Sequence, residues 1–142
     1  MSSELSTEQY GALNAIDGDL ATLVVTAEHG PNNSNNWLSV RLANASSPDV
    51  IMIHNRADQY ASLLDSVQVY LSNTEGDWSS PSVKQCGGLQ QVPVSPGPVT
   101  VRCGGVRMPG QVHVIVRKAA LGFLSLAEVE AYAMTAPTSP PP

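Results

Sequence analysis

Short stretches in which apolar and polar residues alternate constrain the fold of this chain more than any other feature. Residues 37–42 alternate in this way, which is typical of a strand with one face buried. Residues 50–53 form a continuous apolar run, which predicts a strand buried on both faces. The alternating pattern recurs, bounded by Gly, Pro, Asn or Ser, at 67–71, 99–102 and 112–117. Many short strands joined by irregular loops predict an all-β fold, a β-sandwich of the jelly-roll kind.

The rest of the chain fits a single domain. A length of 142 residues suits one module with one core, and 11 Gly with 11 Pro favour turns over a helical bundle. Residues 126–132 are compatible with a helix by propensity or with a closing strand, and the sequence leaves both open. We expect the β-sandwich domain to occupy residues 1–133. The Pro-rich residues 134–142 are expected to form an extended linker.

Charge and composition exclude several classes of function. With 12 acidic and 7 basic residues the net charge is −5, so binding to nucleic acid or to anionic lipid is unfavourable. No apolar run approaches the ~18 residues of a membrane-spanning helix, which argues against membrane insertion. No nucleophile elbow, zinc-ligand spacing, phosphate loop or glycosidase-like carboxylate pair is identifiable. The sequence therefore predicts a protein that is not an enzyme.

Two cysteines and two glycosylation patterns bear on the compartment. Cys86 and Cys103 allow one disulfide in an oxidising compartment, or two buried thiols in a reducing one. Asn32 and Asn44 each begin an N-glycosylation acceptor tripeptide, which has meaning only in a secreted chain. No signal-peptide pattern follows Met1, so either export information lies on a longer parent protein or Met1 is an artificial start. We expect the former, with an extracellular or cell-surface location.

Two groups of polar residues are candidates for binding. Asp17 and Asp19 flank Gly18, a turn whose oxygens either converge on a calcium ion or bond to their own backbone. Arg56 and Asp58 form an Arg-x-Asp pair, which is either a surface ion pair or part of a sugar site. In a sugar site the guanidinium donates several convergent hydrogen bonds to vicinal hydroxyls, while the carboxylate fixes the arginine rotamer.

Several separated motifs, in this order, resemble an F-type lectin (fucolectin) domain of the discoidin, or coagulation-factor type C, class. The resemblance covers roughly residues 5–133 and implies the same jelly-roll sandwich, with binding of fucose or a similar sugar. It rests on Asn14-Ala15-Ile16-Asp17-Gly18-Asp19, Trp37-x-x-Val40-x-Leu42, Asn55-Arg56-x-Asp58, Leu126-x-Glu128-Val129-Glu130-x-Tyr132 and the pair Cys86 and Cys103. The resemblance also implies a disulfide between these two cysteines.

The resemblance extends to the sugar-binding signature. His29 is followed by twenty-six residues and then by Arg-x-Asp, a spacing similar to that of the family. By this resemblance Arg56 donates to the ring oxygen and hydroxyls, His29 binds an axial hydroxyl, and Asp58 orients the guanidinium. Five positions after Asp58, Leu63 stands where the family has a basic residue, which removes one charge-assisted hydrogen bond. Tyr60 is expected to supply an apolar face against the sugar.

The resemblance implies a structural calcium ion as well. Its oxygen ligands would tie the first loop to the last strand: Asn14 (carbonyl), Asp17, Asp19, Thr26, Ala127 (carbonyl) and Glu128. We therefore expect a calcium-stabilised glycan-binding module within a longer extracellular glycoprotein. The alternative is a discoidin-like adhesion or assembly domain with a degenerate sugar pocket, which binds a protein partner. Assembly into a homo-oligomer remains open in either case.

Overall fold

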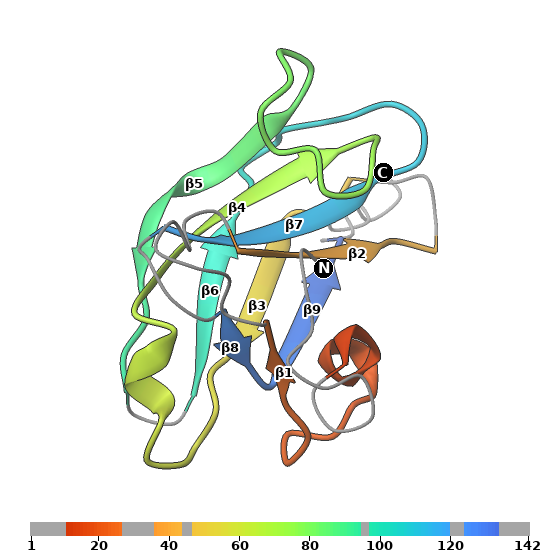
Figure 1. Ribbon diagram of the computed structural model, residues 1–142. Coiled ribbons are helices and arrows are strands. Elements are labelled where there is room, and N and C mark those ends of the chain that lie inside the picture. Colours follow the sequence, from red (N-terminus) through yellow and green to blue (C-terminus); the bar gives the residue numbers. More distant parts are fainter. Residues whose placement is uncertain (1–10, 27–35, 44–46, 95–96, 120–123, 134–142) are drawn as a thin grey trace, which may run out of the picture.

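Two antiparallel sheets pack face to face and carry nearly all of the regular structure (Figure 1). The computed structural model describes residues 11–26, 36–43, 47–94, 97–119 and 124–133. Within these ranges the first sheet has four strands in the order β2-β7-β4-β5. Their bounds are Trp37–Arg41 (β2), Ser66–Ser72 (β4), Lys84–Gln91 (β5) and His113–Lys118 (β7).

The second sheet has three strands in the order β6-β3-β9, and a two-stranded ribbon, β1-β8, lies beside it. The strands are Val24–Val25 (β1), Val50–His54 (β3), Pro98–Arg102 (β6), Ser125–Leu126 (β8) and Glu128–Tyr132 (β9). Two short 3-10 helices accompany them, Ala12–Ile16 (η1) and Ala61–Leu63 (η2). All described strand pairs are antiparallel. The expected all-β sandwich is confirmed.

The core lies between the two sheets, where every second residue of a strand points inward. The largest fully buried side chains include Leu38, Val67, Val69 and Leu71 from one sheet and Ile51, Ile53 and Val101 from the other. The prediction that 50–53 is buried on both faces is wrong, because Val50 and Met52 are only half-buried. An antiparallel sheet of this sandwich packs one face on the core and leaves the other toward solvent.

The structure decides two matters that the sequence left open. Residues 125–132 are strands, β8 and β9, and not a helix, because both pair with strands that precede them in the chain. Cys86 and Cys103 form a disulfide. Since β5 lies in the four-stranded sheet and Cys103 directly follows β6, this bond joins the two sheets.

Strand β5 was not expected, since its sequence contains two glycines and mostly polar residues. It pairs with β4 at the edge of the sheet, where its exposed side needs no apolar residues. The predicted linker 134–142 and the acceptor residues Asn32 and Asn44 lie outside the described residues. In the described part, no helix has the length and apolar character required to cross a bilayer.

Candidate functional site

Arg56 is the centre of a polar network just beyond the end of β3. Its guanidinium donates from Nε to Asp58 Oδ1 at 2.6 Å and from Nη2 to Asp58 Oδ2 at 2.7 Å. A third bond runs from Nη1 to the hydroxyl of Ser125 at 2.7 Å. The Arg56 side chain is 8% exposed and that of Asp58 is 46% exposed. A buried guanidinium in a bidentate pair with a carboxylate has one fixed orientation, with donors left on Nη1 and Nη2.

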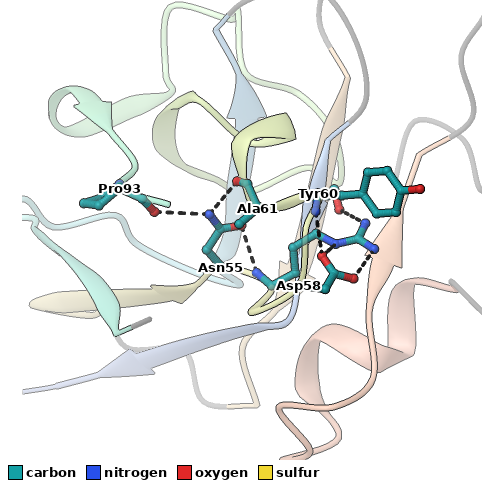
Figure 2. A network of polar contacts seen from close by, with 7 residues as sticks. Asn55, Asp58, Tyr60, Ala61 and Pro93 are labelled. Atoms are coloured by element: carbon teal, nitrogen blue, oxygen red, sulfur yellow. Dashed lines mark hydrogen bonds and ion pairs between the residues drawn. The ribbon is translucent and has the colours of Figure 1, made fainter. Parts of the chain in front are cut away.

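The loop that carries this network is held by Asn55. Its side-chain amide donates to the carbonyl oxygens of Ala61 at 2.8 Å and Pro93 at 3.2 Å, as Figure 2 shows. Its Oδ1 accepts the backbone N–H of Arg56 at 2.8 Å. The first two bonds connect the end of β3 to η2 and to the segment after β5, and the third fixes the Asn55 side chain against the backbone of Arg56. The hydrogen bonds of the Asn55 side chain to these backbone groups therefore fix the position of the Arg56 backbone.

Ser125 was missed by sequence reasoning, although it is as close to Arg56 as the predicted partner Asp58. It belongs to β8, pairs with Val25 and is fully buried. A serine inside an apolar stretch carries no sequence signal for this role. The contact links residues 69 positions apart and arises only because β8 packs beside the end of β3.

A hollow of about 270 Å³ opens beside the guanidinium. Its lining combines the Arg-x-Asp segment with the turn after η1: Leu20, Ala21, Leu23, Arg56, Ala57 and Asp58. Small concave sites with apolar walls and a few oriented polar groups are typical of small-molecule binding. The three residues from the turn were not among the sequence-based candidates.

The other predicted sugar-site residues differ in how much the structure says of them. Tyr60 is 51% exposed, and its ring lies over Arg56 with the guanidinium carbon 5.2 Å from the ring centroid. The structure thus brings Arg56, Asp58 and Tyr60 together. His29 lies outside the described residues. Leu63 ends η2 just after this loop.

The ion pair of Asp58 leads to a prediction on pH. The hydrogen bond from Arg56, followed by that from the backbone of Tyr60, lowers the pKa of Asp58. A carboxyl with a lowered pKa stabilises the fold above its unfolded-state value of about 3.9, and this contribution disappears as the pH falls through the lowered value. We expect wild type to melt above Asp58→Asn at neutral pH, with the gap closing at strongly acid pH. Thermal unfolding of both proteins across this range measures the gap, and a constant gap would contradict the assignment.

The Asp17-Gly18-Asp19 turn forms the second candidate site. Asp17 Oδ1 accepts the backbone N–H of Asp19 at 2.9 Å, and Asp19 Oδ1 accepts that of Ala21 at 2.8 Å. The hydroxyl of Thr22 donates to Asp17, and this bond is the main reason why the pKa of Asp17 is lowered. Both carboxylates thus support their own turn, as the simpler interpretation of the motif predicts. Gly18 has φ +76°, a conformation that favours glycine.

Glu128 on β9 contacts this turn, although the two are far apart in the sequence. It is 4% exposed, and its Oε1 accepts the backbone N–H of Gly18 at 3.3 Å. Its Oε2 is buried and has no hydrogen-bond partner among the residues that the structure describes. Burial raises the pKa of Glu128, and the negative charge of Asp17 adds to the rise. A buried carboxylate oxygen without a partner next to a second carboxylate is the environment that a cation stabilises.

The remaining predicted calcium ligands lie on the same part of the fold. Thr26 is fully buried, and its hydroxyl accepts the backbone N–H of Leu124 at 2.9 Å. Ala127 directly precedes Glu128, and Asn14 lies in η1, which packs against β9. Within the described ranges, no three His, Cys, Asp or Glu side chains are grouped so as to hold a metal ion. A calcium ion here would need backbone carbonyls as well as Asp17 and Glu128, a mixture that calcium accepts.

Comparison with known protein families matches most of this chain to one family. The family model described as NedA-like, galactose-binding domain, of the F5/F8 type C kind, matches residues 14–106. Comparison with curated proteins gives no match to the sequence.

Solved structures show the same fold. A fucolectin from striped bass (Morone saxatilis) serum is 26% identical with a TM-score of 0.74, and the match covers 98% of this chain and 47% of the fucolectin chain. The family 32 carbohydrate-binding module of NanJ from Clostridium perfringens, solved with galactose, is 20% identical with a TM-score of 0.70, covering 92% and 88%. A fucose-binding module from Streptococcus pneumoniae is 20% identical with a TM-score of 0.67, covering 94% and 91%.

Proposed function

We propose that this chain, which belongs to the family of NedA-like, galactose-binding domains of the F5/F8 type C kind, is a carbohydrate-binding module. The hollow beside Arg56 would take fucose or a sugar with similarly placed hydroxyls. The observation that carries the proposal is the buried guanidinium of Arg56, held by Asp58 and Ser125 at the edge of that hollow.

The chemistry of these groups suits a sugar. Within the described residues, Asp58 and Ser125 accept three of the guanidinium's N–H bonds, and an arginine has five. The other two can donate to adjacent sugar oxygens without any change of rotamer. The carboxylate of Asp58 has lone pairs left to accept from a hydroxyl, and the Tyr60 ring offers an apolar face. The similarity to the bass fucolectin and to the pneumococcal fucose-binding module supports fucose, and the similarity to the NanJ module solved with galactose supports galactose.

A glycan array followed by calorimetry tests the proposal. We expect the purified domain to bind neutral glycans that end in fucose or galactose, and free fucose or galactose to compete for the same site. A blank array from a folded domain would refute sugar binding. It would favour instead a protein partner, which the replacement of the family's basic residue by Leu63 allows.

We further propose binding without catalysis, in an extracellular setting. The disulfide between Cys86 and Cys103 supports an oxidising compartment. Binding modules and lectins among the similar structures support a role in recognition.

We also propose that Asp17 and Glu128 hold a calcium ion, together with the carbonyls of Asn14 and Ala127 and the oxygens of Asp19 and Thr26. The buried Oε2 of Glu128, which has no hydrogen-bond partner in the described part of the chain, supports this donor set. When bound, the ion would offset two neighbouring negative charges and tie the turn after η1 to β9. The hydrogen bond from the Gly18 N–H to Glu128 already joins these two elements.

Calcium is therefore expected to stabilise the fold. A ligand at 100 times its dissociation constant adds about 2.7 kcal/mol to the free energy of unfolding, so the melting temperature should rise by several degrees. Glu128→Gln should lose most of this rise, because it removes a charged ligand at nearly constant volume. Glu75→Gln, at an exposed loop position, serves as the matched control and should retain it. Thermal unfolding with calcium or with chelator measures the effect, and an equal response of Glu128→Gln and wild type would contradict the site.

A further inference from the structure

We propose that the ligand is an oligosaccharide, whose second sugar lies in a separate hollow between η1 and the outer face of β3 and β9. This hollow measures about 420 Å³ and is lined by residues that include Ile16, Gly18, Leu20, His54 and Glu130. The inference rests on the proposed function, since it assumes that the terminal sugar binds beside Arg56. It adds the size class of the ligand and a second set of contact residues.

The two hollows adjoin each other. Leu20 lines both of them. His54 lines the second hollow and Arg56 the first, and two residues of chain span at most about 7 Å. A glycan whose terminal residue contacts Arg56 therefore reaches the second hollow with the next residue, by passing over Leu20. Because Leu20 borders both hollows, the occupant that we assign to the second hollow is the next part of the same ligand.

The lining of the second hollow matches the two kinds of surface that a sugar ring presents. Ile16 is 53% exposed and Leu20 is 57% exposed, so apolar side chains stand at its wall and are available to the C–H face of a ring. The polar side chains of the lining are Glu128 and the pair formed by His54 and Glu130. An ionised carboxylate only accepts hydrogen bonds, so a ligand here has to donate, as sugar hydroxyls do. The buried Oε2 of Glu128 belongs to the proposed calcium site, and the proposed contact between the sugar and the second hollow does not require it.

Leu89 supplies a matched control for Ile16. Of the two hollows, Ile16 lines the second and not the first, and Leu89 is exposed to a similar extent, 52%, on β5 in the four-stranded sheet. Ile16→Ala and Leu89→Ala thus remove comparable exposed apolar groups at two distant places. Neither residue touches the network around Arg56.

Calorimetry with paired probes tests the inference: fucose against fucosyllactose, and galactose against lactose. We expect wild type to bind the longer member of the preferred pair about tenfold tighter than the monosaccharide, the scale of one well-packed apolar contact. Ile16→Ala should lose most of this gain while keeping the monosaccharide affinity, and Leu89→Ala should behave as wild type. Backbone amide NMR adds a test without mutation, because Gly18 should shift with the longer probe and not with the monosaccharide.

The outcomes separate the two proposals. If no monosaccharide or oligosaccharide binds, the proposed function fails and this inference fails with it. If the monosaccharide binds but the longer probe gains nothing, the proposed function stands and the second hollow is not a sugar site. An equal gain in Ile16→Ala and wild type, with Gly18 unshifted, overturns the inference in the same way.

Discussion

Replacing Arg56 with alanine is expected to abolish detectable glycan binding. The substitution removes the whole guanidinium, including the two N–H groups proposed to bind the sugar. It also leaves Asp58 and Ser125 without the donor that they share. A hydrogen bond to a charged group contributes about 1.5–3 kcal/mol, so the loss of two predicts at least a hundredfold lower affinity. Calorimetric titration of wild type and Arg56→Ala with the preferred glycan measures the loss.

Two further variants separate binding from stability. Arg56→Lys keeps a positive charge but lacks the planar fork, so it should bind at least tenfold more weakly than wild type. Arg102→Ala removes an arginine from an exposed position on β6 and should bind as wild type does. Melting temperatures of all three show how much of any loss comes from the fold. Full binding by a folded Arg56→Ala protein would exclude this site.

Removing the disulfide is expected to cause the largest loss of stability. Cys86 and Cys103 are 17 positions apart, and a loop of this size corresponds to about 3 kcal/mol in the chain-entropy model. Because the bond joins the edge strand β5 to the end of β6, its loss also removes a disulfide cross-link between the two sheets. Urea unfolding of wild type and the Cys86→Ala/Cys103→Ala double variant measures the difference in free energy of unfolding.

The same double variant provides a control for the sugar site. Cys103 follows Arg102, which pairs with Val50 at the start of β3, whereas Arg56 lies beyond the opposite end of that strand. The folded fraction should therefore keep its glycan affinity. Reduced wild type should unfold like the double variant, and a difference between oxidised and reduced wild type below about 1 kcal/mol would contradict the entropic account.

Apart from 50–53, which was predicted from a continuous apolar run, the strands that the sequence predicted are those with a period of two. Stretches such as 37–42 and 112–117 alternate because one side of each strand faces the core, and this requirement is written in the sequence itself. Strand β5 lacks the pattern because it lies at an edge and is held by its pairing with β4 and by the disulfide. Helix and strand were indistinguishable for 126–132 because only the pairing of β9 with β3 decides between them.

The features of the candidate sites also differ in whether residues close together in the sequence or the tertiary structure determine them. By itself the sequence determined the alternating strands, the Arg-x-Asp pair and the Asp-Gly-Asp turn, because these depend on residues close together in the chain. The tertiary structure alone decided that Ser125 holds Arg56, that Glu128 meets Gly18, and that Leu20 lies between two adjoining hollows. These contacts join residues far apart in the sequence. They exist because sheet pairing and core burial bring β8, β9 and the turn after η1 to the same end of the sandwich, and no local pattern records that arrangement.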